Sequence, residues 1–384
     1  MKKEYYSRLL PDPFIKENGT RLKRPEEWKE QKLHFRALAQ KYLYGTWPQK
    51  EGSLDIQGEK SEPADGGRAV RETVLLAING AFPFRIEIVR PSVPGKIPVI
   101  VWNTTKENLR CPVEEDVLAA GYAVASFDRE QIRPDLESAD RRGNRGKAEK
   151  QKYPNLPCGD IMAWGWGHSV AADYLRTRNF AGPLIAAGHS RGGKAALCAG
   201  IFDSRFLVTA PIGSGCGGLG CARFLGTADG SRQDERKCET IGSITHAFPT
   251  WFCQKYAEFG TEEKPYPLGD AVNFFPLDAN ILRAACAPNA VFSSEGIEDD
   301  WSNPFGNQLC WQSAEEVFDF LGIPERNGFH IRPGKHEFNG HDWLALIDFC
   351  DIVLKRRRTL PHGDLNQPYF PIDLRSYCPQ KPEF

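Results

Sequence analysis

The sequence predicts an α/β fold, with a mostly parallel central sheet in a three-layer sandwich and helices on both faces. Apolar runs at 97–103, 122–128 and 184–190 are almost continuously hydrophobic, as strands covered on both faces are. Helical patterns at 161–177 and 191–202 follow such runs along the chain. Alternation of strand and helix is typical of βαβ units, which build parallel sheets.

The remaining elements extend this pattern along the chain. Two runs at 72–78 and 84–91 alternate partly, as antiparallel strands with one covered face do. Further strands are expected at 206–213, 290–296 and 329–336, before a final helix that begins near His341. This order is the layout of an α/β-hydrolase, in which strands precede the catalytic turns.

The whole chain, 1–384, is expected to form a single α/β-hydrolase catalytic domain. A helical pattern around 25–44 predicts an N-terminal helical segment within residues 1–50 that packs on the core. Residues 51–70 are rich in Gly, Ser and Glu and predict a loop. The stretch 214–280 predicts an irregular insertion over the active site.

Composition and charge exclude several classes of partner. The formal net charge is −1, which gives no long-range field to attract nucleic acid or an anionic membrane. No apolar run approaches the roughly 18–20 residues of a membrane helix. The opening residues MKKEYYSRLLPDPF lack the apolar stretch of a signal peptide, so the expected location is cytoplasmic.

Eleven cysteines are scattered through the sequence, and their odd number argues against a complete disulfide framework. Most are therefore expected to be reduced. No CxxC pair lies near a second pair or a two-histidine cluster, so no metal site is expected.

Residues Gly188-His189-Ser190-Arg191-Gly192 match the G-x-S-x-G motif. The glycines are needed because the strained turn is packed so tightly that side chains there would strike neighbouring backbone. An apolar strand precedes the motif and an Ala-rich helix follows it, which is the context of a nucleophile elbow. Ser190 is the predicted nucleophile, and the Arg191 backbone N–H is the expected first oxyanion donor.

A base and an acid should follow the serine in the chain order Ser, acid, His. His336 is favoured as the base because it lies just past a strand and a Pro-Gly turn. His341 is the alternative, whereas His330 lies within the strand and is expected to be packed. The loop 295–301 offers four carboxylates for the acid, Glu295, Glu298, Asp299 and Asp300, and composition does not separate them.

Taken together, these residues resemble the glucuronoyl esterase family of carbohydrate esterases, from Leu10 to about Arg357. The resemblance rests on five motifs in the family's order: Gly188-His189-Ser190-Arg191-Gly192-Gly193-Lys194; Ser214-Gly215-Cys216-Gly217-Gly218; Phe248-Pro249-Thr250-Trp251-Phe252; Glu298-Asp299-Asp300-Trp301 with Asn303-Pro304; and Ile331-Arg332-Pro333-Gly334-Lys335-His336 with Asp342-Trp343.

The resemblance implies a catalytic triad of Ser190, His336 and an acid. It also implies that Arg191 stabilises the oxyanion through its side chain and that Lys194 contacts a sugar hydroxyl. Many members place a glutamate before Ser-Gly-x-Gly-Gly, where this chain has Gly213. The acid must then come from the other position that members use, which selects Asp299, with Asp300 and Glu298 behind it. Some relatives place a tryptophan against the sugar where this chain has Ala222, so the substrate could be smaller or different.

The implied activity is serine-dependent hydrolysis of esters of glucuronic acid or a related sugar, through an acyl-enzyme on Ser190. The expected partner is a small carbohydrate ester, without nucleic acid or membrane, and the mechanism needs neither a metal nor an organic cofactor. Alternatives are an acetylxylan-type deacetylase, a general carboxylesterase, and a non-catalytic binding protein on the same fold. The sugar, the alcohol and the oligomeric state are not set by the sequence.

Overall fold

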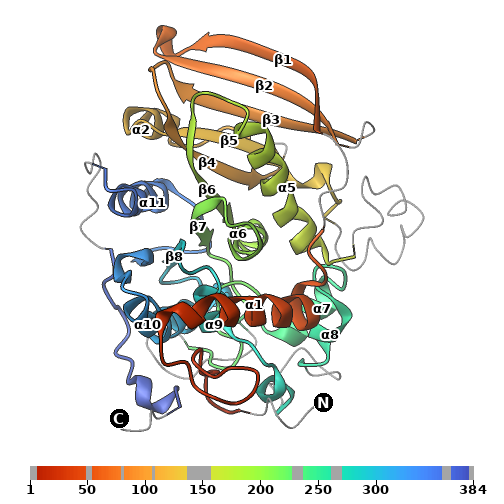
Figure 1. Cartoon of the computed structure of the whole chain (residues 1–384), viewed down its shortest axis with the longest axis vertical. Coiled ribbons are helices and arrows are strands. Elements are labelled where there is room, and N and C mark those ends of the chain that lie inside the picture. The colour runs from red at the N-terminus through yellow and green to blue at the C-terminus, as the bar shows by residue number, and fades with distance from the viewer. Residues whose placement is uncertain are drawn as a thin grey trace.

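The computed structural model describes residues 7–48, 54–78, 82–105, 109–135, 157–226, 237–260, 270–356 and 365–379. These residues form one nine-stranded sheet in the order β1-β2-β3-β5-β4-β6-β7-β8-β9 (Figure 1). The strands are β1 (Leu54–Ala64), β2 (Ala69–Ile78), β3 (Phe82–Pro91), β4 (Ile97–Thr104), β5 (Ala123–Asp128), β6 (Ala181–His189), β7 (Phe206–Ile212), β8 (Ala290–Gly296) and β9 (Asn327–Arg332).

The sheet is mixed but mostly parallel. Strands β4 to β9 pair in parallel with one another, whereas β1, β2 and β3 pair antiparallel and join the sheet at β5. The parallel strands bring their carboxyl ends to one edge, where an α/β sheet builds its sites. The predicted fold class is therefore confirmed.

Helices cover both faces of the sheet (Figure 1). On β4, Val99 and Val101 pack in one apolar cluster with α5 and α6, and Ile100 and Trp102 pack in another with α2 and α11. The helices are α1 (Trp28–Ala39), α2 (Glu114–Ala119), α5 (Asp160–Leu175), α6 (Arg191–Phe202), α7 (Ile241–Ala247), α8 (Gln254–Ala257), α9 (Ala279–Ala284), α10 (Pro304–Phe320) and α11 (Gly340–Val353). Shorter helical turns are η2 (Pro25–Glu27), η3 (Gln40–Tyr44), η4 (Asp65–Gly67), η6 (Arg129–Gln131), η7 (Asp270–Phe274), η8 (Asp300–Ser302), η9 (Pro324–Arg326) and η10 (Leu374–Ser376).

The N-terminal helical segment packs on the core as expected. Phe35 and Leu38 of α1 belong to the same apolar cluster as Ile281 of α9. Lys32 Nζ donates to the carbonyls of Cys286 and Ala287, at 3.1 and 2.8 Å. Figure 1 shows α1 lying beside α9, so this segment covers the half of the molecule opposite β1.

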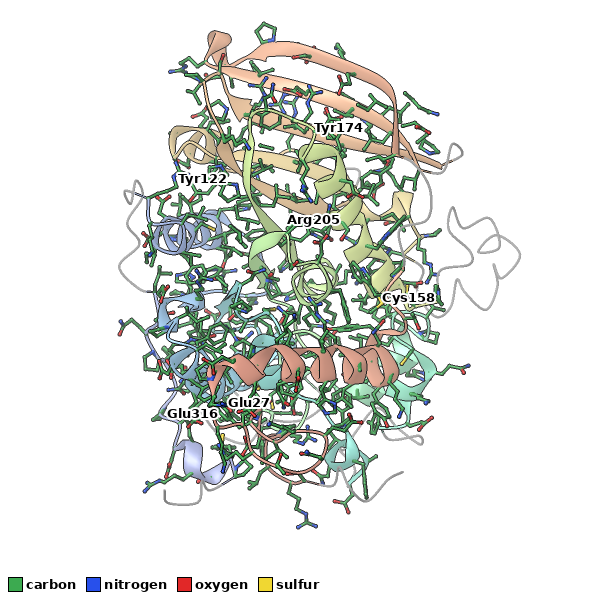
Figure 2. All side chains as sticks on the ribbon, in the orientation of Figure 1. Glu27, Tyr122, Cys158, Tyr174, Arg205 and Glu316 are labelled. Atoms are coloured by element: carbon green, nitrogen blue, oxygen red, sulfur yellow. The ribbon has the colours of Figure 1, made fainter. Side chains whose placement is uncertain are left out.

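The prediction of a loop at 51–70 is wrong, because much of this stretch is the edge strand β1. Almost all of β1 is exposed, so neither face has the apolar alternation that marks a half-buried strand. Its backbone is paired with β2 from Leu54↔Ile78 to Ala64↔Ala69. Tyr174 of α5, labelled in Figure 2, donates its hydroxyl to Glu59 of β1 at 2.6 Å. Pairing rather than burial therefore makes this segment a strand.

The prediction of an irregular stretch at 214–280 is also partly wrong. Its described part contains α7, α8, η7 and the start of α9, while 227–236 and 261–269 lie outside the described residues. The 17-residue helix α10 was missed, although its start carries a clear signal. Asn303 caps it by accepting from the Gly306 amide at 2.9 Å, and Pro304 occupies the first turn.

All eleven cysteines carry free thiols, in line with the predicted lack of a disulfide framework. Across the described residues, no helix combines the length and the apolar character that a membrane span requires.

Candidate active site

Ser190 lies in a sharp turn between β6 and α6. Its φ of 55° and ψ of −124° place a non-glycine residue in a strained backbone region, as a nucleophile elbow requires. Its amide donates to the Ile212 carbonyl at the end of β7, at 2.9 Å. The turn thus holds Ser190 at the carboxyl edge of the sheet.

The glycines of the motif are required by close backbone contacts. A Cβ on Gly188 would lie 2.1 Å from the Gly192 carbonyl oxygen, and one on Gly192 would lie 2.6 Å from Asn103 Oδ1. Asn103 of β4 donates to the Gly192 carbonyl at 2.7 Å, which ties the first turn of α6 to the sheet. Side chains at either glycine would force the strand and the helix apart.

His336 is paired with Asp299. The imidazole Nδ1 lies 2.6 Å from Asp299 Oδ2, and Ser302 Oγ lies 3.0 Å from the same nitrogen. The Asp299 side chain is 2% exposed, whereas that of His336 is 32% exposed. Burial alone would raise the pKa of Asp299, but the hydrogen bond and charge of His336, with the Ser302 contacts, hold it below the ordinary value. The carboxylate therefore stays ionised beside the imidazole.

Backbone contacts hold the two loops that carry this pair together. The Glu298 amide donates to the Gly334 carbonyl at 3.0 Å, and the Ile297 amide donates to the Arg332 carbonyl at 2.8 Å. A Cβ on Gly296 would come within 2.5 Å of the Gly334 and Lys335 carbonyl oxygens. The close approach fixes the separation of Asp299 and His336 before any substrate binds.

The other candidates for the base and the acid lie elsewhere. His330 is buried in β9, with Nδ1 2.7 Å from Ser294 Oγ, as expected for a packed residue. His341 is exposed on the first turn of α11. Glu298 is exposed and Asp300 is half-buried, so Asp299 is the carboxylate of this loop that contacts His336.

Glu295, the fourth carboxylate, lies within β8 rather than in the loop. Its side chain is buried and accepts from Asn307 Nδ2 at 2.5 Å. Burial raises the pKa of Glu295 well above the ordinary value, and the charges of Asp299 and Asp342 act in the same direction. A carboxyl that is disfavoured as an anion is a poor partner for an imidazolium.

Gly213 occupies the place where many members carry a glutamate. A Cβ built there would lie 3.6 Å from His336 Cε1 and 3.2 Å from His189 Nε2. A side chain at this position would project toward the imidazole, which gives the physical reason why an acid could serve from here. In this chain Gly213 has no side chain, and Asp299 supplies the carboxylate that contacts the imidazole.

His189, within the elbow motif, packs directly on the candidate base. Its ring centroid lies 4.6 Å from that of His336, and its buried Nε2 has no hydrogen-bond partner among the residues that the structure describes. Burial, followed by the charge of His336, lowers the pKa of His189 to about 3. His189 is therefore neutral at neutral pH and provides an uncharged surface for the second imidazole.

Arg191 is held in place by Asp135 and two aromatic rings. Its Nη1 donates to Asp135 Oδ2 at 2.9 Å, and its guanidinium lies over the rings of Phe248 and Trp251, at 5.1 and 4.7 Å. Arg129 Nη2 also donates to Asp135 Oδ2, at 3.2 Å. The Arg191 side chain is still 32% exposed, so it is positioned but not enclosed.

Lys194, the predicted sugar contact, is almost fully buried. Its side chain is 2% exposed, and Nζ donates to Glu239 Oε2 at 2.8 Å. Burial raises the pKa of Glu239, and the charge and hydrogen bond of Lys194 oppose this. A Cβ on Gly215 would lie 2.2 Å from Glu239 Oε2, so the Gly-rich segment packs directly against the pair. The sugar contact itself stays a prediction.

A cavity of about 440 Å³ opens beside Ser190. It is lined by Trp102, Asn103, Thr104, Thr105, Arg110, Pro112, Arg129, His189, Ser190, Arg191 and Phe338. The Lys194–Glu239 pair and Trp301 do not line this cavity; the Trp301 carbonyl accepts from the Glu239 amide at 3.0 Å. The Trp301 side chain is 40% exposed, and an exposed indole beside the acid loop offers a flat surface for a ring.

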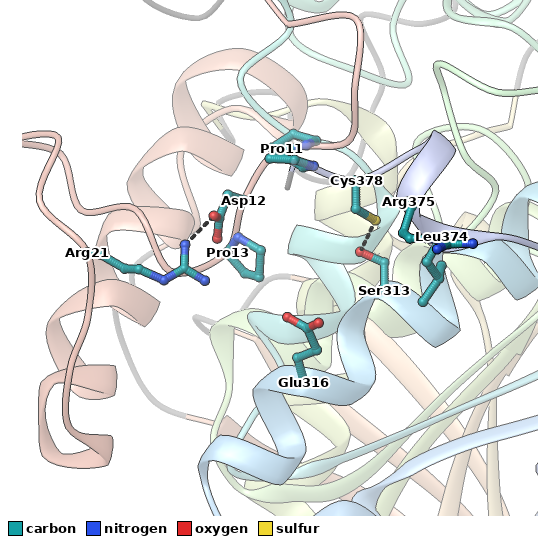
Figure 3. A pocket seen from close by; sticks show the side chains of 10 residues that line it. Pro11, Asp12, Pro13, Arg21, Ser313, Glu316, Leu374, Arg375 and Cys378 are labelled. Atoms are coloured by element: carbon teal, nitrogen blue, oxygen red, sulfur yellow. Dashed lines mark hydrogen bonds and ion pairs between the residues drawn. The ribbon is translucent and has the colours of Figure 1, made fainter. Parts of the chain in front are cut away.

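A second cavity, of about 510 Å³, is separate from this site. It lies between the N-terminal segment, α10 and the C-terminal segment, where Asp12 pairs with Arg21 and Cys378 lies 3.5 Å from Ser313 (Figure 3). None of its lining residues belongs to the elbow or to the loops of Asp299 and His336.

Among the described residues, one group has the geometry to hold a metal ion: Cys221, Asp278 and Cys310. Asp278 already accepts from Arg223 Nη1 at 2.9 Å and from the amides of Ala222 and Ala279, both at 2.8 Å. Burial raises the pKa of both thiols, which disfavours the thiolate that a metal needs. These residues do not fit a metal centre well.

Ala222, where some relatives place a tryptophan against the sugar, is buried in the core rather than at the cavity.

Sequence reasoning missed four residues of this site: His189, Asp135, Glu239 and Ser302. Asp135 and Glu239 lie 56 and 45 residues from the cations that they hold. One signal was available, because the elbow motif places Arg191 and Lys194 on one turn of a helix that is otherwise apolar, and buried cations need acidic partners. Which of the many acids would serve was not readable from the chain.

Comparison with known proteins gives the site a family. A relative described as a carbohydrate esterase, from an unknown prokaryotic organism, is 28% identical over 403 residues and covers 89% of each chain. The 4-O-methyl-glucuronoyl methylesterase 1 of Wolfiporia cocos is 26% identical over 375 residues, or 95% of this chain and 84% of the relative. A solved glucuronoyl esterase of carbohydrate esterase family 15, from Caldicellulosiruptor kristjansonii, superposes with a TM-score of 0.75 at 27% identity and covers 97% of both chains. A sequence profile described as glucuronyl esterase, fungi, matches residues 78–322, well over half of the chain. The chain therefore belongs to the glucuronyl esterase family.

Proposed function

We propose that this protein is a serine esterase that hydrolyses esters of glucuronic acid. The observation that carries the proposal is the His336–Asp299 contact of 2.6 Å next to an elbow that holds Ser190, in a chain of this family. The name of the Wolfiporia cocos relative, a glucuronoyl methylesterase, supports a uronate ester as the substrate. The cytoplasmic location stays a prediction.

The mechanism that fits these residues has two displacements. Ser190 Oγ attacks the ester carbonyl carbon and its proton passes to His336 Nε2, while Asp299 stabilises the imidazolium. The carbon–oxygen bond to the alcohol then breaks, and the alcohol leaves with the proton from His336. Water, deprotonated by the same imidazole, attacks the acyl-enzyme and releases the uronic acid and Ser190.

Arg191 supplies two donors for the oxyanion that forms in each step. Its backbone N–H is the first of α6, where the helix dipole favours negative charge, and its guanidinium is held by Asp135. A donor that is already positioned costs little reorganisation when the negative charge develops. Arg191 therefore acts on the transition state rather than on the resting ester.

In this proposal the sugar part of the ester lies against Lys194, Glu239 and Trp301. An ammonium and a carboxylate offer donors and acceptors for hydroxyls, and the exposed indole of Trp301 offers stacking area. Because Lys194 is so deeply buried, any sugar contact must use a proton of Nζ that Glu239 does not take.

The test compares methyl glucuronate with acetylated xylose on one preparation of the enzyme and of Ser190→Ala. Hydrolysis of the uronate ester at a higher kcat/KM than the acetyl ester, with loss of about 10⁴-fold or more in Ser190→Ala, is the expected result. Preference for the acetyl ester would favour the deacetylase alternative. Activity retained in Ser190→Ala would remove the serine mechanism, and no activity in the parent protein would favour a binding protein.

A further inference from the structure

The cavity beside Ser190 has a one-sided charge, of which the proposed mechanism uses only Arg191. Three arginines line it, Arg110, Arg129 and Arg191, and among the residues that the structure describes no carboxylate lines it. Asp135, which pairs with two of them, lies behind them, with a side chain only 4% exposed. The described lining of the cavity is therefore positively charged.

Two of these cations have bonding capacity left for a ligand. Arg129 is buried, with 9% of its surface exposed, and its Nε has no hydrogen-bond partner in the described part of the chain. Arg110 is exposed at the cavity wall and forms no hydrogen bond or ion pair with any residue that the structure describes. Glu62 of β1 lies within reach of its field, but Glu62 bonds to Lys60 at 2.8 Å.

The position of the cavity identifies which part of an ester it would receive. The proposed function places the glucuronate on the side of Lys194, Glu239 and Trp301, and none of these residues lines the cavity. An ester bound at Ser190 has two parts, so the alcohol part lies on the cavity side. At about 440 Å³ the cavity falls within the roughly 300–1,000 Å³ of small-molecule sites.

We propose that this cavity is the binding site of the leaving alcohol and that it selects an alcohol that carries a carboxylate. The inference rests on the proposed function, because it assumes a uronate ester at Ser190. Arginine binds carboxylates through paired N–H donors, and a site with low-dielectric walls such as Trp102 and Phe338 strengthens that attraction. The esterified uronate has no free carboxylate of its own, so the selected charge must belong to the alcohol.

The experiment compares two esters of glucuronic acid that differ in charge but hardly in shape, the 4-carboxybenzyl and the 4-carbamoylbenzyl ester, with the methyl ester as reference. We expect a kcat/KM ratio of about ten or more in favour of the carboxylate, the scale of one hydrogen bond between charged groups. In Arg110→Gln the ratio should fall several-fold, and 0.5 M salt should lower it in the parent enzyme. Arg375→Gln, which removes the same charge at the separate cavity of Figure 3, should leave the ratio unchanged.

A ratio near or below one in the parent enzyme would overturn the proposal, as would a ratio that Arg110→Gln leaves unchanged. Hydrolysis of the methyl ester with no preference between the benzyl esters would refute the proposed alcohol site and leave the proposed esterase function standing. If no glucuronate ester is hydrolysed, the proposed function fails and the inference fails with it. Arg110 is exposed, so its substitution should not impair folding, and the salt dependence gives a second readout.

Discussion

At the scale of single residues, His336 is oriented by two neighbours at one ring nitrogen. Asp299 and Ser302 both approach Nδ1, at 2.6 and 3.0 Å, which leaves Nε2 as the nitrogen that can serve Ser190. Ser302 Oγ lies 3.2 Å from the Gly213 carbonyl, so its hydroxyl joins the acid loop to the end of β7. A neutral amide in place of Asp299 would favour the wrong tautomer of the imidazole.

We therefore predict that Asp299→Asn lowers kcat for a glucuronate ester by about 10⁴-fold with little change in fold. Asp300→Asn is the matched control, because Asp300 is the next residue of the same loop, whereas His336 Nδ1 is contacted by Asp299 and Ser302. It should retain activity within a few-fold. Steady-state kinetics and circular dichroism on both variants check this, and equal small losses would mean that the acid lies elsewhere.

His189 predicts a pH effect on stability. Its pKa in the folded protein is lowered to about 3, whereas an unfolded histidine titrates near 6.5. Below pH 6.5 the unfolded chain binds a proton that the folded protein refuses, so stability is lost as the pH falls toward 3. Between pH 6.5 and 5 this single group costs about 2 kcal/mol, at 1.36 kcal/mol per pH unit.

His189→Gln should remove that loss. Free energies of unfolding by urea at pH 7 and pH 5 should show a drop about 2 kcal/mol smaller in the variant than in the parent protein. His168, also buried with a pKa lowered to about 4, remains in both proteins and cancels in the comparison. Equal drops would show that His189 titrates normally in the folded state.

At the scale of elements, the first turn of α6 is held by carboxylates from two distant segments. Asp135 follows η6 and holds Arg191, and Glu239 precedes α7 and holds Lys194. The N-terminus of α6 therefore meets both the β5 side of the sheet and part of the 214–280 stretch. The helix that carries the nucleophile is positioned from outside its own sequence.

For Asp135 we predict an effect on the transition state. Asp135→Asn should lower kcat about tenfold while KM changes little, because the guanidinium loses its fixed position but ground-state binding is kept. In a double-mutant cycle with Arg191→Ala the two losses should not add. Asp173→Asn is the control, since Asp173 forms an ion pair with Arg205, at 2.6 Å, and neither residue belongs to the site. Additive losses would show that Asp135 does not act through Arg191.

Substitutions in the Lys194–Glu239 pair should show whether the pair stabilises the fold, binds the sugar, or does both. Lys194→Met leaves the Glu239 carboxylate buried and unpaired, which should cost about 3–5 kcal/mol of stability. The double variant Lys194→Met with Glu239→Gln should recover part of it. If Lys194 also contacts the sugar, the double variant should still lose kcat/KM on methyl glucuronate more than on p-nitrophenyl acetate. Parallel losses on both esters would leave Lys194 a purely structural role.

At the scale of the whole molecule, the apolar clusters join the N-terminal segment to the sheet. Trp28, Phe35 and Leu43 pack in the same cluster as Trp164 of α5 and Leu197 of α6. The helix α1 therefore supports the layer that carries the nucleophile elbow. The proposed single domain implies that this segment and the site unfold together.

Phe35→Ala tests that implication. Removal of this ring, which is 4% exposed, should cost about 3–5 kcal/mol of stability. Thermal unfolding should remain one transition, with near-UV circular dichroism and loss of esterase activity shifting together. Two transitions, with activity surviving the first, would show that the N-terminal segment is a separate unit.

The sequence by itself determined the parts of this protein whose signals are local. The buried strands were readable because burial on both faces requires consecutive apolar residues. The elbow at Ser190 was readable because its motif is contiguous and Gly188 contacts Gly192 within the same turn. His336 was favoured from its place after a strand and a Pro-Gly turn. Resemblance, rather than local pattern, selected Asp299 from the acidic loop.

Tertiary structure decided what depends on residues far apart in the chain. It placed Asp299, rather than its neighbours, against His336, because the approach of Gly296 to Gly334 aims one carboxylate inward. It made a strand of the exposed β1, because hydrogen bonding to β2 needs no apolar pattern. It also brought Asp135 and Glu239 to the cations of α6. Attraction between charges acts through space, so such partners show no periodic pattern in the sequence.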